Sequence, residues 1–271
     1  MELKELFKIA INASLKGGKE IMEIYSSDFS VESKEDNSPL TLADKNCNLI
    51  IEQMLSRTEI PILSEEGVQT PFSKRNFWEF FWLVDPLDGT KEFVKRNGEF
   101  TVNIALIHNG VPKLGVVYAP VRKELYFALD EIGSFKKDSF LHPIEDVDDL
   151  VADSSSLPIY AERDVFTIVG SRSHMSTETE DFFLEKKKEY GEVNILSIGS
   201  SLKICMVAEG KADVYPRYAP TMEWDTGAGH AIAKYAGCSV NQYNKTDELV
   251  YNKEDLLNPW FLVKRINAKK D

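Results

Sequence analysis

Two aspartates and a threonine directly follow a strongly apolar segment, and their types and spacing suit metal-assisted chemistry. Segment 81–84 (F-W-L-V) predicts a buried strand because it is short and rich in aromatic and branched residues. Segment 85–90 (D-P-L-D-G-T) follows it, and its proline and glycine predict a turn. Two carboxylates on one turn repel each other unless a cation lies between them. Hard oxygen ligands are typical of Mg²⁺, which usually accompanies phosphate groups.

Three further segments carry acidic residues, two before this turn in the chain and one after it. Segment 38–44 (S-P-L-T-L-A-D) ends at Asp44, Glu65 begins an E-E-G segment, and segment 224–231 (W-D-T-G-A-G-H-A) contains Asp225. Together the four segments resemble the motifs of the inositol monophosphatase superfamily, the lithium-sensitive, Mg²⁺-dependent phosphatases. In that family D-P-x-D-G-T and W-D-x-x-A-G are the two signature motifs. The resemblance covers most of the chain.

The resemblance implies a site with two to three Mg²⁺ ions. Glu65, Asp85 and the carbonyl oxygen of Leu87 would hold the first ion. Asp85, Asp88 and Asp225 would hold the second, and a weaker third ion would lie near Glu65.

The resemblance also implies how water and phosphate are handled. Thr90 would hydrogen-bond the attacking water and Asp44 would accept from Thr90, so Thr90, Asp44 and Glu65 are the expected catalytic residues. General-base assistance of this kind is typically worth ~10²–10⁴ in rate. The backbone N–H groups of Gly89 and Thr90, expected at a helix start, would bind the phosphate.

Other interpretations of the same residues remain open. Segment 41–44 is also a capping box, and Asp225 could simply cap the helix that follows it. An EF-hand loop is excluded by the spacing of the acids. A phosphoaspartyl phosphatase has one residue between its two acids, whereas Pro86 and Leu87 both lie between them here. A covalent aspartyl intermediate is therefore not expected.

Three segments of the second half resemble the 3′(2′),5′-bisphosphate nucleotidase branch of the family. They are 171–174 (S-R-S-H), 199–203 (G-S-S-L-K) and 215–217 (Y-P-R). A nucleotide with two phosphates needs an anion site away from the metals, for which Lys203 and Arg217 are suitable cations. Ser200 or Ser201 would donate to the substrate at a helix N-terminus, and His174 would contact adenine. The expected substrate-binding residues are Gly89, Thr90, His174, Ser200, Ser201, Lys203, Arg217 and Asp225.

The expected reaction is hydrolysis of 3′-phosphoadenosine 5′-phosphate to AMP and phosphate by in-line attack of a metal-activated water. One alternative is the same chemistry on inositol phosphates or fructose 1,6-bisphosphate. An alternative of another class is a noncatalytic sensor of nucleotide or metal.

Residue patterns predict a mixed α/β (α+β) fold. Helices are expected over 3–24 and 41–55, then a largely antiparallel sheet, and after the acidic stretch 145–156 helices and strands alternate. The latter include a strand at 212–215 and a helix at 226–236. We expect an N-terminal lobe at 1–148 and a C-terminal lobe at 149–271, with the site between them. The resemblance implies a layered α-β-α-β-α sandwich of the inositol monophosphatase and fructose-1,6-bisphosphatase type.

Composition limits the partners. The net charge of −12 over 271 residues argues against binding a long nucleic acid, which needs basic surface. No apolar stretch approaches 18 residues, so no integral membrane segment is expected. The start of the chain does not resemble a secretory signal, and three scattered cysteines fit a reducing cytoplasm. Peripheral attachment to the inner membrane and the oligomeric state are left open.

Overall fold

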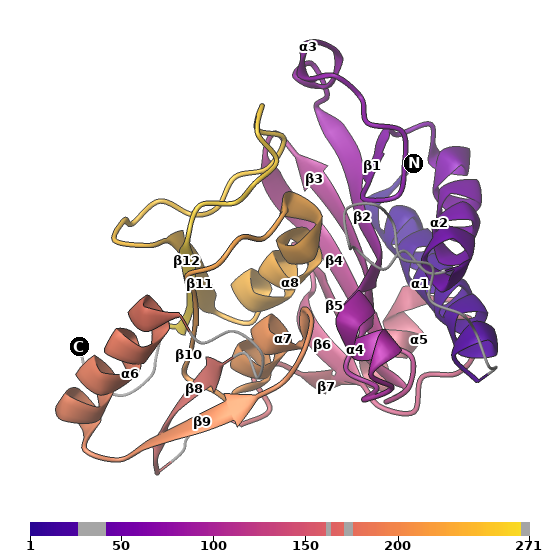
Figure 1. Ribbon diagram of the computed structural model, residues 1–271. Coiled ribbons are helices and arrows are strands. Elements are labelled where there is room, and N and C mark those ends of the chain that lie inside the picture. Colours follow the sequence, from indigo (N-terminus) through magenta and orange to yellow (C-terminus); the bar gives the residue numbers. More distant parts are fainter. Residues whose placement is uncertain (27–41, 161–163, 171–175, 267–271) are drawn as a thin grey trace.

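The computed structural model describes residues 1–26, 42–160, 164–170 and 176–266, which form two sheets with helices between and around them (Figure 1). The strands of the first sheet run in the order β1 to β7. They are β1 (Ile62–Ser64), β2 (Phe80–Asp88), β3 (Thr101–His108), β4 (Val111–Ala119), β5 (Glu124–Leu129), β6 (Gly133–Lys137) and β7 (Ser155–Ser156). The second sheet has the order β11-β12-β10-β8-β9. Its strands are β8 (Phe166–Gly170), β9 (Val193–Ser197), β10 (Val214–Arg217), β11 (Cys238–Gln242) and β12 (Phe261–Arg265).

The helices and sheets form five layers. Helices α1 (Leu3–Tyr25) and α2 (Leu42–Leu55) cover one face of the first sheet, and α7 (Leu202–Glu209) and α8 (Glu223–Tyr235) lie between the two sheets. Helix α6 (Thr177–Tyr190) covers the outer face of the second sheet. The predicted α-β-α-β-α sandwich is confirmed.

Burial of the first sheet on both faces explains the apolar character of its strands. Every residue of β2 from Phe81 to Leu87 is buried, as is β3 from Thr101 to Ile107. One face packs on α1 and α2 and the other on α7 and α8, and these are the two large apolar cores of the molecule. Strands covered on both faces carry near-continuous apolar runs instead of strict alternation.

Strand pairing places the acidic residues at one end of the sheet. Strand β1 runs parallel to β2 with Ser64 opposite Val84, and the Glu65 N–H donates to the Val84 carbonyl at 3.1 Å. Glu65 therefore leaves its strand beside Asp85. Between Asp85 and Asp88 the pairing of β2 with β3 is irregular, which bends the strand as a bulge does.

Several predicted boundaries differ from the structure. Strand β2 continues to Asp88 through the irregularity, whereas a turn was expected after position 85, because Asp88 still pairs with Thr101. Helix α8 begins at Glu223 instead of 226, so Asp225 lies inside its first turn. Strand β10 spans 214–217 instead of 212–215 because its register is set by pairing with β12.

Three short helices and three strands were not predicted. They are the 3₁₀-helix η1 (Ser56–Thr58), α3 (Phe72–Arg75) and α5 (Val147–Ala152), together with β6, β7 and β11. The helix start expected at Gly89 and Thr90 is the short helix α4 (Thr90–Val94). Elements this short carry too few residues for a periodic pattern.

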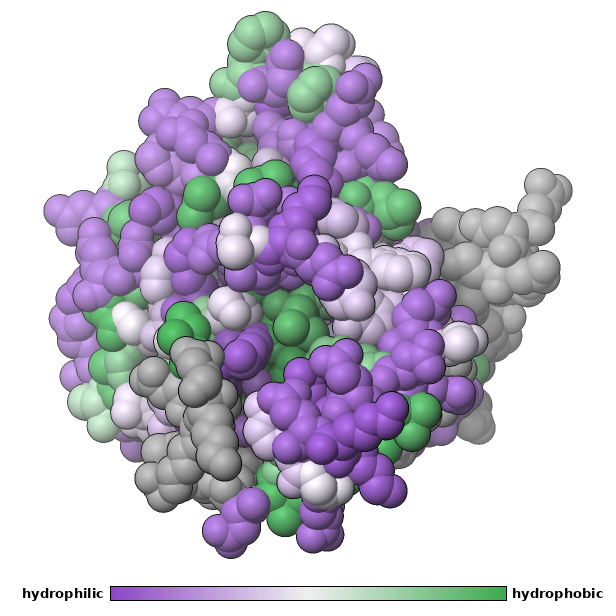
Figure 2. All heavy atoms as spheres, turned by 90° about the vertical axis from the view of Figure 1, so that its left-hand side faces the viewer, coloured by the Kyte–Doolittle hydropathy of each residue, from purple (hydrophilic) through white to green (hydrophobic). Residues whose placement is uncertain are grey.

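The first sheet ends at Ser156 and the second begins at Phe166, so the change of sheet falls just after the predicted boundary at 148/149. The division into two lobes stays a prediction. No helix within the described ranges is both long and apolar enough to span a membrane. The face formed around α6 is largely hydrophilic, with small separate hydrophobic areas (Figure 2).

Candidate metal and phosphate site

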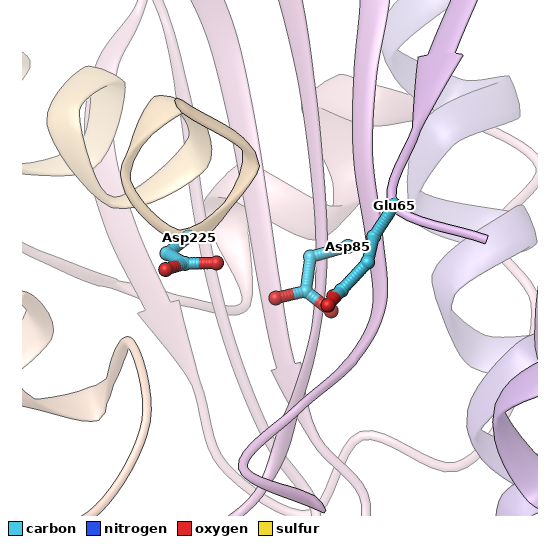
Figure 3. Close-up of side chains that lie close together, drawn as sticks. All are labelled: Glu65, Asp85 and Asp225. Carbon is cyan, nitrogen blue, oxygen red and sulfur yellow. The ribbon is translucent and has the colours of Figure 1, made fainter. Parts of the chain in front are cut away.

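Three carboxylates from three elements meet at the end of the first sheet. Glu65 follows β1, Asp85 lies in β2 and Asp225 lies in the first turn of α8. One carboxylate oxygen of each lies within 4.8 Å of the others. Glu65 and Asp85 point toward each other, and Asp225 faces them from α8 (Figure 3). This is a set of hard oxygen donors suited to Mg²⁺.

The electrostatics of the cluster favour a bound cation. Asp85 is 1% exposed, and burial followed by the charge of Glu65 raises its pKa well above the ordinary value. Burial and the charge of Asp88 raise the pKa of Asp225 to about 8. Glu65 is exposed as a residue, but its carboxyl group is enclosed, and burial together with Asp88 raises its pKa to about 7. A buried carboxylate resists losing its proton when it has no partner, and a nearby cation stabilises its charged form.

Asp88 lies beside this cluster but is held by other groups. Its Oδ2 atom accepts hydrogen bonds from the Ser201 N–H at 2.5 Å and the Ser201 hydroxyl at 2.8 Å. A longer contact of 3.4 Å comes from the Asn103 amide. The metal role of Asp88 stays a prediction, in which its Oδ1 atom is the available ligand.

The remaining predicted ligand and phosphate groups lie on the same turn. The Leu87 N–H donates to Asp85 Oδ1 at 3.1 Å, which folds the turn over the carboxylate. Gly89 has φ of 98° and precedes α4, whose first residue is Thr90. A Cβ atom at Gly89 would also lie 3.2 Å from the Glu99 carbonyl oxygen. Glycine suits this position because other residues rarely adopt such a φ.

The expected hydrogen bond from Thr90 to Asp44 stays a prediction. Asp44 is buried at 3% exposure in α2, and Thr90 is half-buried. Their catalytic roles stay predictions, and the Thr41 part of the capping-box interpretation lies outside the described residues.

Two cations and two acids line one small cavity of about 60 Å³. Lys203 and Arg217 face it together with Asp88 and Asp225. Among the described residues Lys203 has no salt bridge, and its ammonium lies 6.0 Å from the centre of the Tyr215 ring. Burial lowers the pKa of Lys203, and the nearby Arg217 charge adds to the effect. A cation in this state is suited to bind an anion.

Arg217 is only partly engaged. Its Nη2 atom donates to the Pro220 carbonyl at 2.9 Å, while its buried Nε atom has no hydrogen-bond partner among the described residues. Lys203 and Arg217 thus lie beside the same cavity, and their contact with a substrate stays a prediction.

The predicted serines differ in what they contact. Ser201 directs both its N–H and its hydroxyl at Asp88, so these donors face a carboxylate and not the open cavity. Ser200 lines the cavity and has φ of 49°. His174 lies outside the described residues, as does the rest of segment 171–174.

Asp225 also caps its own helix, as the alternative interpretation suggested. Its Oδ2 atom accepts from the Met222 N–H at 2.9 Å, so capping occupies one oxygen and leaves the other free for a cation. Two residues later, a Cβ atom at Gly227 would lie 2.7 Å from the Leu83 side chain. The glycine therefore allows α8 to lie close to β2.

Asn103 contributes to the site and was not singled out from the sequence. It is 1% exposed, pairs with Asp85 across β2 and β3, and donates to the Ser201 hydroxyl at 2.9 Å. Its Oδ1 atom accepts from the Thr101 hydroxyl at 2.9 Å. A signal was present, since an asparagine in an otherwise apolar buried strand needs polar partners.

Comparison with known proteins agrees with this site. The model of the family described as "Inositol monophosphatase family" matches residues 2–269. A Salmonella typhimurium protein named 3′(2′),5′-bisphosphate nucleotidase CysQ is 44% identical over 96% of this chain and 98% of its own length. The Escherichia coli (strain K12) protein of the same name is 42% identical over the same shares.

Solved structures lead to the same family. CysQ from Bacteroides thetaiotaomicron, described as a bacterial member of the inositol monophosphatase family, is 50% identical, with a TM-score of 0.92 and 99% of each chain covered. The suhB protein of Bartonella henselae is 22% identical with a TM-score of 0.74 and shares the fold. This chain belongs to the inositol monophosphatase family, because the family model matches nearly all of it and because relatives of 44% and 50% identity cover nearly its whole length.

Proposed function

We propose that this protein is a Mg²⁺-dependent 3′(2′),5′-bisphosphate nucleotidase, a phosphoric monoester hydrolase acting on 3′-phosphoadenosine 5′-phosphate. The observation that carries the proposal is one cavity lined by the acids Asp88 and Asp225 and the cations Lys203 and Arg217. A substrate with two phosphates could place one beside these cations and the other beside the acidic cluster with its metal ions, whereas inositol 1-phosphate has only one phosphate to place. The curated relatives, named for this activity at up to 44% identity, favour a nucleotide over fructose 1,6-bisphosphate.

Each residue has a part in the proposed reaction. Glu65, Asp85, Asp88, Asp225 and the Leu87 carbonyl would hold two to three Mg²⁺ ions. Bound Mg²⁺ supplies positive charge to the phosphate oxygens and lowers the pKa of a water molecule. Thr90 would orient that water, Gly89 would donate its N–H to the 3′-phosphate, and Lys203 and Arg217 would hold the 5′-phosphate.

The products of the reaction balance without a covalent enzyme intermediate. Water attacks phosphorus opposite the 3′-oxygen, and the bond between phosphorus and the 3′-oxygen breaks. The 3′-oxygen then receives a proton. AMP and inorganic phosphate result.

The first test is phosphate release from three substrates: 3′-phosphoadenosine 5′-phosphate, inositol 1-phosphate and fructose 1,6-bisphosphate. We expect a strong preference for the nucleotide with Mg²⁺, loss of activity in EDTA and inhibition by Li⁺. Preference for either other substrate would overturn the nucleotide assignment and keep the metal site. No release from any substrate would favour the sensor alternative.

The anion site has its own prediction. Arg217→Ala should raise KM for the bisphosphate nucleotide about tenfold or more, since hydrogen bonds to charged groups are worth about 1.5–3 kcal/mol. KM for inositol 1-phosphate should change little. Arg57→Ala, which changes an exposed residue of η1, is the control and should alter neither value. Equal effects of Arg217→Ala on both substrates would remove Arg217 from the 5′-phosphate site.

A further inference from the structure

A small polar network supports Asp88 from behind, and its centre is Ser201, the residue before α7. The Ser201 hydroxyl lies 2.8 Å from Asp88 Oδ2 and 2.8 Å from the carbonyl oxygen of Asp225. It accepts a hydrogen bond from the Asn103 amide at 2.9 Å. One side chain thus joins the ends of β2, β3, α7 and α8.

The network also fixes its own orientation. The Thr101 hydroxyl donates to Asn103 Oδ1 at 2.9 Å, which directs the Asn103 amide NH₂ group toward Ser201 and Asp88. Thr101, Asn103 and Ser201 are 0%, 1% and 3% exposed, so water does not compete for these bonds. Buried polar groups that are fully paired hold one arrangement because breaking it leaves them unsatisfied.

The donors are concentrated on one oxygen of Asp88. Ser201 gives its N–H to Oδ2, and Asn103 adds a longer contact to the same atom. The Ser201 hydroxyl lies 2.8 Å from both Oδ2 and the Asp225 carbonyl oxygen, and its single hydrogen is donated to one of them at a time. Oδ2 thus receives most of the donors, whereas Oδ1 accepts no hydrogen bond from the residues that the structure describes. Rotation of the carboxylate would break all of these bonds together.

We propose that Ser201 and Asn103 are positioning residues for the metal site, holding Asp88 so that only its Oδ1 atom faces the cation. The inference rests on the metal role proposed for Asp88. The Ser201 hydroxyl is also within hydrogen-bond distance of the Asp225 carbonyl oxygen. Ser201 directly precedes α7, the helix that carries Lys203, so it lies between both proposed metal ligands and the proposed anion site.

The test compares Ser201→Ala and Asn103→Ala with the wild type and with Ser14→Ala. Ser14 is 0% exposed and donates to Ile11 within α1, so its variant removes a buried hydroxyl outside the network. Calorimetry gives the Mg²⁺ dissociation constant, circular dichroism checks folding, and activity is measured across Mg²⁺ concentrations.

We expect Ser201→Ala and Asn103→Ala to raise the Mg²⁺ dissociation constant about tenfold or more, the usual effect of removing groups that orient metal ligands. High Mg²⁺ should restore part of their kcat. Ser14→Ala should change only thermal stability.

The possible failures are distinguishable. If wild type and Ser201→Ala bind Mg²⁺ equally well, the positioning role is wrong while the metal site stands. If Ser201→Ala lowers only the unfolding temperature, the network is purely structural and the inference is overturned. If the wild type binds no Mg²⁺, the proposed metal role falls, and the positioning role with it.

Discussion

At the scale of single residues, the acidic cluster is unfavourable as a set of anions until a cation arrives. The pKa of Glu65 is raised to about 7 and that of Asp225 to about 8, in both cases first by burial and then by Asp88, and that of buried Asp85 is raised as well. In the metal-free protein these groups retain protons near neutral pH that the unfolded chain has already lost. The site is therefore a place where protons and cations compete.

This competition predicts two opposite pH dependences. Because the folded pKa values exceed the unfolded ones, the unfolded chain binds fewer protons between about pH 4 and 8, so metal-free stability should fall as pH rises through that window. The affinity for Mg²⁺ should rise over pH 6–8, by up to about tenfold per unit for each proton displaced. Thermal unfolding in EDTA and Mg²⁺ titrations at pH 6, 7 and 8 measure the two trends.

Asp225→Asn serves as the comparison, since it removes one of the titrating groups. It should flatten the metal-free stability trend while weakening Mg²⁺ binding. An affinity for Mg²⁺ that stays constant from pH 6 to 8 would contradict the competition.

At the scale of elements, the site depends on how closely α8 approaches the first sheet. Gly115 of β4 lies under this helix, and a Cβ atom there would clash with the Ala228 carbonyl oxygen and lie 2.8 Å from the Ala231 side chain. Asp225 lies in the first turn of this helix, so we expect a shift of the helix to move Asp225 with it. A small residue in a strand thus helps to set the position of Asp225, a proposed metal ligand, on a helix.

We predict that Gly115→Ala destabilises the protein by about 1–3 kcal/mol, as overpacking usually does, and also weakens Mg²⁺ binding. Denaturant unfolding and Mg²⁺ calorimetry measure the two effects. Gly170→Ala is the matched control in another strand, because the nearest atoms to its Cβ would be at an ordinary 3.5 Å. Unchanged Mg²⁺ affinity in a folded Gly115→Ala protein would show that α8 adjusts without moving Asp225.

At the scale of the whole molecule, a buried charge joins α7 to the first sheet. Glu209, 1% exposed at the end of α7, accepts from the Tyr126 hydroxyl at 2.8 Å and lies 3.4 Å from the Lys136 ammonium. Lys136 is 6% exposed and also contacts Glu124 at 3.0 Å. These contacts join segments far apart in the chain, so they help hold α7 against the first sheet.

Glu209→Ala should lower the free energy of unfolding by about 3–5 kcal/mol because it leaves buried polar partners unsatisfied. Asp148→Asn removes an exposed ion pair with Lys4, in which the Asp148 side chain is 68% exposed. It should lower the free energy of unfolding by less than about 1 kcal/mol. Urea unfolding of both variants provides the measurement. Similar small losses in both would mean that the buried network contributes little to stability.

The sequence by itself determined the family, the layered fold and the local parts of the site. The apolar strand before Asp85, the glycine at position 89 and the helix near Asp225 each depend on a few neighbouring residues, so local pattern sufficed to detect them, although not to set their ends. Glu65 was also predictable because it belongs to an ordered set of family motifs.

Only the tertiary structure decided which distant groups meet. Asn103 and Ser201 are 98 positions apart in the chain, yet their side chains are hydrogen-bonded behind Asp88. Strand pairing extended β2 through Asp88, and packing of α8 on Gly115 placed Asp225 opposite Asp85. Local propensity holds no information on such contacts, because burial and hydrogen-bond partners come from strands and helices brought together by the fold.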